Sequence, residues 1–254
     1  MAIGIFDSGV GGLSMVRAVD SIAPSADLIY LGDTARVPYG LKTTEQLEEI
    51  TADNFRFMID AGVEKVFIAC GTISSLLCNK GYPDMGIPYV TVINATAKSA
   101  AAATKSGSVT VLGTVATCRN RGFEKELLSI TDNLSITYVP CQDFVSLCES
   151  GRVSPDDPLV MECVRKSLEP VPGDSDTVIL GCTHFPFLED AIRRVLPNAN
   201  LINCSYETAY AHRDVFREGS GIRSFWVTGD PSSFSVNSDM LLGYHVETGR
   251  HING

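Results

Sequence analysis

The sequence lacks any long run of hydrophobic residues. No stretch approaches the roughly 20 apolar residues that a membrane-spanning helix needs. The first residues, MAIGIFDSG, carry no basic segment of the kind that begins a secretory signal. We therefore expect a cytoplasmic protein that makes no membrane contact. With 254 residues, 44% of them hydrophobic, the chain is long enough to bury a large core in one domain or two lobes.

Positive charge is also scarce. The chain has 20 Lys and Arg residues against 30 Asp and Glu residues, which gives a formal net charge of −10. Such a chain repels polyanions, so nucleic acid is not an expected partner. A small acidic substrate is still compatible with this charge if its pocket is neutral and lined by hydrogen-bond donors.

Spacings typical of metal or cofactor sites are missing. The eight cysteines form no C-x-x-C or zinc-finger pattern, and Cys182 and His184, two residues apart, have no partner at ligand spacing. The G-x-S-x-G motif of serine hydrolases is absent, and no lysine falls in the strand-end motifs where a pyridoxal phosphate Schiff base would be sought. We expect neither a metal nor a cofactor.

Short apolar runs alternate with segments of helical pattern. This βαβα order predicts an α/β fold with parallel sheets flanked by helices. The segment 43–62, for example, has a threonine near its start, acidic residues in its first turns and Gly62 as a stop. The predicted strands are residues 3–6, 27–32, 65–70, 89–93, 108–113, 135–139, 177–182 and 199–203.

A faint internal repeat divides these strands into two sets of four. VFIACGT at 66–72 matches VILGCTH at 178–184, and VINATAKSA at 92–100 matches LINCSYETA at 201–209. Cys70 and Cys182 then occupy equivalent strand ends. Because ligands of parallel sheets bind at the carboxyl ends of strands, two facing lobes would each deliver one thiol to a common cleft. The apolar stretch 225–230 in the tail is expected to add a strand to the first lobe.

Thiols at these positions suit acid/base chemistry. Their ordinary pKa of about 8.5 is close enough to neutrality to be tuned by a neighbour such as His184. A buried cysteine is nevertheless often only a small core residue, and His184 alone is compatible with a capping role.

The glycine-rich turn FDSGVGG also has two interpretations. It resembles part of a nucleotide-binding fingerprint, with Asp33 placed 21 residues after Gly12, but it lacks the third glycine of G-x-G-x-x-G. In the alternative interpretation Asp7 merely caps the helix that follows.

Four motifs together closely resemble glutamate racemases of the cofactor-independent aspartate/glutamate racemase superfamily. They are DSGVGG, GDTARVPYG, the AC-x-T turn and LGCTHFPFL, and the match in order and spacing runs from residue 3 to about residue 230. The resemblance implies two α/β lobes, 1–95 with 207–254 and 96–206, an active site in the cleft between them and no cofactor. It leaves open whether the protein is a homodimer.

The resemblance also implies a mechanism with two bases that supplies D-glutamate for peptidoglycan. Cys70 would act on the D-enantiomer with help from Asp7, and Cys182 on the L-enantiomer with help from His184. Glu149 resembles a further acid on the Cys182 side. The substrate-binding positions carried over from the family are Asp7, Ser8, Tyr39, Gly40, Gly71, Thr72, Thr183 and His184, and Thr114 and Thr117 are further neutral donors near predicted strand ends.

One residue departs from the family pattern. The usual turn is Cys-Asn-Thr, whereas this chain has Cys70, Gly71 and Thr72. Glycine offers no side-chain amide to the substrate. Two alternatives to glutamate racemisation therefore stay open: a racemase or isomerase for aspartate or another small acid, and a non-catalytic amino-acid-binding protein of the same fold.

Overall fold

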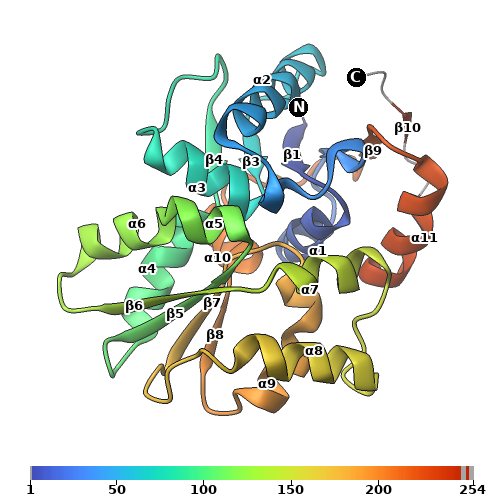
Figure 1. The fold of residues 1–254 in the computed structure, drawn as a ribbon. Helices are drawn as coiled ribbons and strands as arrows, with labels where there is room; N and C mark the ends of the chain where they lie inside the picture. Colours follow the sequence, from blue (N-terminus) through green and yellow to red (C-terminus); the bar gives the residue numbers. More distant parts are fainter. Residues whose placement is uncertain (1, 247–249, 252–254) are drawn as a thin grey trace.

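The computed structural model describes residues 2–246 and 250–251, and these contain two parallel sheets (Figure 1). The first sheet has the strand order β10-β9-β2-β1-β3-β4, and the second has the order β6-β5-β7-β8. The strands are β1 (Ile3–Asp7), β2 (Leu28–Gly32), β3 (Val66–Ile68), β4 (Tyr89–Thr91), β5 (Ser108–Gly113), β6 (Ser135–Pro140), β7 (Thr177–Leu180), β8 (Asn200–Asn203), β9 (Arg223–Val227) and β10 (Arg250–His251). The predicted α/β class and the eight predicted strands are confirmed.

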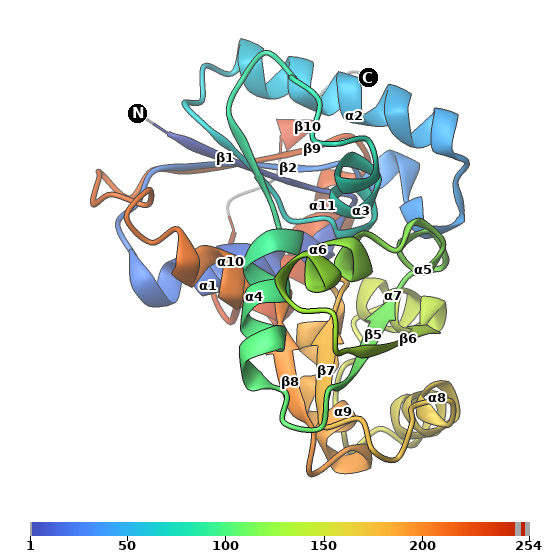
Figure 2. The ribbon, with the colours of Figure 1, turned by 90° about the vertical axis from the view of Figure 1, so that its left-hand side faces the viewer.

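The strand order confirms the internal repeat. The order β2-β1-β3-β4 in the first sheet has the same pattern as β6-β5-β7-β8 in the second. Cys70 follows β3 and Cys182 follows β7, so the two thiols stand at equivalent strand ends. In Figure 2 the strands of the first sheet run across the view, whereas β7 and β8 run down it.

The tail returns to the first sheet, as predicted. Strand β9 pairs in parallel with β2, with Arg223 opposite Leu28 and Val227 opposite Gly32. The boundaries of the two lobes near residues 95 and 206 stay a prediction. The helices at the junction, α4 (Ile93–Ala103) and α10 (Cys204–Ala211), pack against each other, and α10 also packs against α1 (Leu13–Ile22).

Helices flank both sheets. They are α1 (Leu13–Ile22), α2 (Thr44–Asp60), α3 (Gly71–Asn79), α4 (Ile93–Ala103), α5 (Val115–Asn120), α6 (Gly122–Ile130), α7 (Gln142–Glu149), α8 (Pro158–Leu168), α9 (Glu189–Val195), α10 (Cys204–Ala211) and α11 (Pro231–Leu242). The predicted helix at 43–62 is α2. Thr43 and Gln46 form a capping box at its start, which satisfies two backbone N–H groups that have no partner within the helix.

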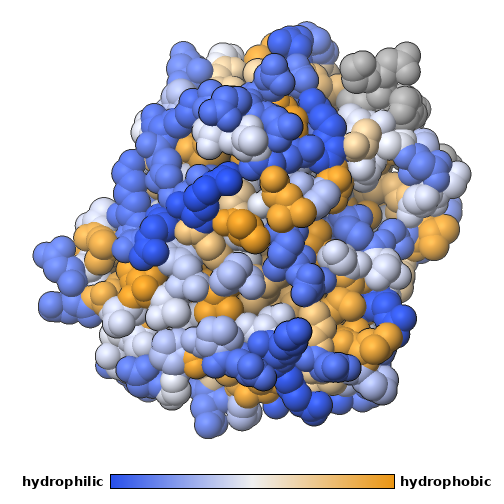
Figure 3. Space-filling model, in the orientation of Figure 1, coloured by the Kyte–Doolittle hydropathy of each residue, from blue (hydrophilic) through white to orange (hydrophobic). Residues whose placement is uncertain are grey.

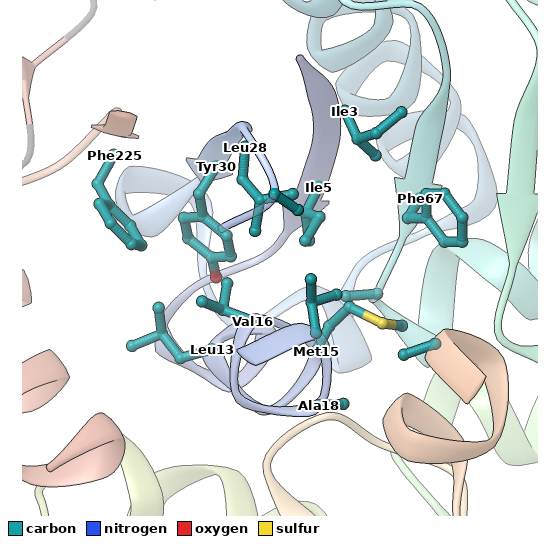
Figure 4. Packing of buried hydrophobic residues seen from close by; sticks show 14 of the residues in the cluster. Ile3, Ile5, Leu13, Met15, Val16, Ala18, Leu28, Tyr30, Phe67 and Phe225 are labelled. Atoms are coloured by element: carbon teal, nitrogen blue, oxygen red, sulfur yellow. The ribbon is translucent and has the colours of Figure 1, made fainter. Parts of the chain in front are cut away.

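Each sheet is buried on both faces. Hydrophobic side chains of α1, α10 and α11 cover one face of the first sheet, and those of α2 and α3 cover the other. Figure 4 shows Leu13 and Val16 of α1 packed beneath Ile5, Leu28 and Tyr30 of the sheet. In the second sheet α7, α8 and α9 cover one face, and α4 and α6 the other. This burial on both faces explains why the strands are continuous apolar runs in the sequence.

Hydrophobic residues on the face seen in Figure 3 form small groups separated by hydrophilic ones. Among the described residues, no helix is long and apolar enough to cross a membrane.

Candidate active site

A small cavity lies where the carboxyl ends of the two sheets meet. Its volume is about 10 Å³, roughly the space that holds one water molecule. An amino acid can therefore enter only if the lobes separate. A larger groove of about 770 Å³ runs beside the edge strand β4, but neither Cys70 nor Cys182 lines it.

Most of the predicted site residues line this cavity. Both sulfur-bearing residues do so, with Cys70 only 4% and Cys182 only 5% exposed. Three predicted site residues lie behind the lining: Asp7, Thr117 and Glu149. Each forms a hydrogen bond with a residue that lines the cavity. The full lining is Ser8, Pro38, Tyr39, Gly40, Cys70, Gly71, Thr72, Thr114, Gln142, Val145, Cys182, Thr183 and His184.

Asp7 is the buried carboxylate at the end of β1. Its Oδ1 accepts the backbone N–H groups of Gly9 at 3.2 Å and Gly12 at 3.0 Å, so it does cap the turn that follows. Its Oδ2 accepts the Thr183 hydroxyl of the second sheet at 3.1 Å. Burial raises the pKa of Asp7, and the charge of His184 and these hydrogen bonds oppose the rise only in part. Asp7 thus connects the glycine turn to the residue after Cys182.

His184 connects Cys182 to Glu149. Its Nδ1 lies 3.6 Å from the sulfur of Cys182, and its Nε2 lies 2.7 Å from Oε1 of Glu149 at the end of α7. Burial lowers the pKa of His184, but the hydrogen bond and charge of Glu149, together with the charge of Asp7, outweigh burial and raise this pKa above its usual value. The imidazole is therefore held ready to carry a proton beside the Cys182 thiol.

Both thiols are strongly biased toward the neutral form. Burial, followed by the charge of Asp7, raises the pKa of Cys70 to about 12. Burial also raises the pKa of Cys182, and the charges of Asp7 and Cys70 add to this effect. Because a thiolate at one sulfur disfavours a second thiolate opposite, the pair favours at most one thiolate at a time.

A chain of three hydroxyls crosses from one lobe to the other. The Oγ1 atoms of Thr72 and Thr114 are 2.9 Å apart, and those of Thr114 and Thr117 are also 2.9 Å apart. Thr114 additionally caps α5 by accepting the N–H of Thr117 at 3.1 Å. Thr117 thus supports Thr114 from behind the cavity wall.

The hydroxyl of Tyr39 is already engaged. It donates to Asp33 and accepts the amide of Asn54 at 3.1 Å. Asp33 also accepts Arg36 Nε at 2.6 Å and the Thr228 hydroxyl at 2.7 Å. With its carboxylate surrounded in this way, Asp33 is not available to a nucleotide ribose.

Four glycines of the first lobe touch the second lobe around the cavity, and we call Gly9, Gly11, Gly40 and Gly71 the glycine seam. An ideal Cβ on Gly71 would lie 2.0 Å from the carbonyl oxygen of Gly181. An ideal Cβ would also lie 2.5 Å from Glu149 on Gly9, 2.5 Å from His184 on Gly11 and 2.2 Å from Gln142 on Gly40. A side chain at Gly71 is therefore incompatible with this approach of the lobes, which gives a packing reason for the departure from the family pattern.

Sequence reasoning missed Pro38, Gln142 and Val145 in the cavity wall. Gln142 had a usable signal, because it stands just beyond the carboxyl end of β6, the type of position at which the other site residues were sought. Within residues 2–246, no three His, Cys, Asp or Glu side chains are grouped as metal ligands.

Comparison with known proteins places this geometry among racemases. The model of the Asp/Glu/Hydantoin racemase family matches residues 7–204. The glutamate racemase of Persephonella marina is 35% identical over 249 residues, which cover 97% of this chain and 95% of the relative.

Solved structures agree over the same extent. The crystal structure of a glutamate racemase isoform from Bacillus anthracis superposes with a TM-score of 0.91 at 29% identity and covers 99% of this chain and 97% of its own. A glutamate racemase from Francisella tularensis in complex with D-glutamate has a TM-score of 0.86 at 28% identity, with the same coverage.

Proposed function

Because this chain belongs to the Asp/Glu/Hydantoin racemase family, we propose that it interconverts L- and D-glutamate with Cys70 and Cys182 as its two acid/base groups. The observation that carries this proposal is the pair of thiols, which reach one buried cavity from equivalent ends of β3 and β7. The protein is thus an isomerase that uses its own side chains for the chemistry.

The reaction removes the proton from the α-carbon of the substrate and adds another proton to the opposite face of the same carbon. A thiolate on one side of the substrate takes the α-proton, and the electron pair of the broken C–H bond is held by the substrate carboxylate as the carbon becomes planar. The opposite thiol gives its proton to the other face and becomes the thiolate. Configuration inverts, and Cys70 and Cys182 exchange roles, with Cys70 acting on D-glutamate and Cys182 on L-glutamate.

Substrate binding helps to form the first thiolate. The ammonium group of a bound amino acid lowers the pKa of both raised thiols, because a nearby positive charge favours the anion. Protonated His184, held by Glu149, stabilises a thiolate at Cys182. Asp7 serves the Cys70 side as a nearby buried carboxylate. Backbone N–H groups at the start of α3 and the Thr72 hydroxyl are preorganised donors for the Cys70 thiolate and the adjoining carboxylate.

Two alternatives lose support. Gly71 is accounted for by the approach of the lobes, so it no longer indicates a substrate other than glutamate. A binding protein without activity would not need two opposed thiols with acid/base partners.

The reaction supplies D-glutamate for peptidoglycan. The eight cysteines are free, and thiols used as acid/base groups stay reduced in the cytoplasm, where we place the enzyme. Whether the protein forms a homodimer is still open, and sedimentation velocity tests it.

The test follows α-proton exchange and optical rotation with L-glutamate in heavy water under reducing conditions. The wild type is expected to exchange and racemise, whereas Cys70→Ser and Cys182→Ser each lose at least about 100-fold in kcat/KM, since a hydroxyl is a far weaker acid than a thiol. Cys163→Ser, at a half-buried thiol of α8, is the matched control. A wild type that neither exchanges nor racemises glutamate would rule out the proposed activity.

A further inference from the structure

Gln142 is a cavity residue that the mechanism above does not use. It is the first residue of α7 and directly follows β6 and Cys141. It lines the same cavity as Cys70 and Cys182. Its side chain therefore faces the place where the proposed substrate must bind.

The geometry leaves one end of the Gln142 amide unused. Oε1 accepts the backbone N–H of Val115 at 3.4 Å, which assigns the oxygen to the α5 side. Gly40 packs so closely that its ideal Cβ would lie 2.2 Å from this oxygen. Among the described residues, Nε2 of Gln142 has no hydrogen-bond partner.

The residues that line the cavity indicate which substrate group the free N–H of Gln142 binds. Glutamate carries two carboxylates, yet the cavity lining includes no Lys or Arg in the part of the chain that the structure describes. The one cationic group of the described lining, His184, is already engaged by Glu149 and lies beside Cys182, so the other lining donors for the carboxylates are neutral. The charge of a carboxylate raises the strength of such hydrogen bonds. Gln142 lies with Gly40 and Thr114, whereas the carboxylates of Asp7 and Glu149 gather around His184. The ammonium group of glutamate is therefore expected on the side of Asp7 and Glu149, and one of its carboxylates is expected beside Gln142.

We propose that Gln142 is a specificity-determining residue that donates an N–H of Nε2 to a carboxylate of bound glutamate. This proposal rests on the proposed function and adds a substrate contact from the second lobe. Because the donor approaches from α7, it engages fully only when the two lobes close on the substrate.

Two substitutions test the contact. Gln142→Glu keeps the length and the Oε1 acceptor for Val115 but replaces the donor by a negative charge. Gln142→Met keeps the length and removes all polarity. We expect KM for both glutamate enantiomers to rise about 10-fold or more in Gln142→Met, and further in Gln142→Glu, while kcat changes less.

The matched control places the same charge on the same helix. Ser146→Glu lies one turn along α7 on an exposed residue and is expected to leave KM within about 2-fold. Glutamine as a competitive inhibitor identifies the carboxylate involved. If Gln142 binds the side-chain carboxylate, Gln142→Glu raises KM for glutamate but leaves the inhibition constant of glutamine unchanged or lower. If it binds the α-carboxylate, both constants rise together.

Either of these two patterns supports the proposal. It is overturned if both Gln142 variants keep the wild-type KM, or if Ser146→Glu raises KM as much as Gln142→Glu does. Racemisation by the wild type is measured in the same series, so a failure of the proposed activity is separated from a failure of this contact.

Discussion

The protonation state of His184 depends mainly on Glu149, and the charge of Asp7 adds a smaller effect in the same direction. Glu149 does not line the cavity, yet its hydrogen bond and charge, together with the charge of Asp7, overcome the effect of burial on the His184 pKa. With Nε2 donating its proton to Glu149, neutral His184 has no proton on Nδ1, so it can donate to the sulfur of Cys182 only when the ring is protonated. The raised pKa extends this assistance to higher pH. Glu149 is thus a positioning and tuning residue for the thiol.

Glu149→Gln is expected to lower the pKa of His184 and to reduce kcat/KM by about 100-fold. Support from protonated His184 is present below its pKa and lost as the pH rises through it. The descending alkaline limb of kcat/KM therefore moves to lower pH in the variant. Because the equilibrium constant of racemisation is one, kcat/KM must fall equally in both directions. Profiles from about pH 5 to pH 9 measure this shift.

Glu162→Gln in α8 removes an exposed carboxylate and serves as the control for the change in net charge. An alkaline limb that stays in place in Glu149→Gln would contradict the proposed role of the imidazolium.

At the level of secondary-structure elements, Asp33 fixes the segment that carries Tyr39 and Gly40. Its carboxylate joins η2 (Thr34–Arg36), η3 (Tyr39–Leu41) and Thr228 just beyond β9. Residues nearly 200 positions apart are held by one buried side chain, which ties the tail to the wall of the site. The position of Gly40 in the glycine seam depends on this contact.

Tyr39→Phe tests whether the hydroxyl is structural. The change leaves Asp33 without one donor and Asn54 without its acceptor, and the free energy of unfolding is expected to fall by about 1–3 kcal/mol. Urea denaturation measures it, with Tyr206→Phe as a control at a tyrosine that is 44% exposed. Unchanged stability with a large rise in KM would instead assign the Tyr39 hydroxyl to the substrate.

Much of this arrangement could be predicted from the sequence, because its signals are local. Apolar runs predict the strands, and the repeat predicts that Cys70 and Cys182 are equivalent. The end of β3 was predicted at residue 70, but the strand stops at Ile68 because Cys70 already begins α3 as its N-cap. The contact of Thr228 with Asp33 and that of Gly71 with Gly181 have no local signal. Both arise from the packing of segments that are distant in the chain.

At the scale of the whole molecule, the site works only if the lobes move. The cavity is far smaller than an amino acid, and both sulfurs are almost fully buried. Substrate must enter when the lobes are apart, and closure must then bring the sulfurs to opposite faces of the α-carbon. The glycine seam allows this closure because backbone of the first lobe meets side chains and backbone of the second without an intervening Cβ.

Gly71→Ala is the most direct test of closure. A Cβ 2.0 Å from the Gly181 oxygen cannot be accommodated, and the opposing atom belongs to the backbone, so the lobes must stay further apart. Since a displacement of about 1 Å at reacting groups can cost roughly 100-fold in rate, we expect kcat/KM to fall by at least about 10-fold. Cys70 and Cys182 should also be alkylated faster by iodoacetamide, as followed by peptide mass spectrometry. Gly173→Ala, whose Cβ meets nothing within 4 Å, should change neither quantity. Wild-type kcat/KM and wild-type alkylation rates in Gly71→Ala would show that catalysis does not require the lobes to approach this closely.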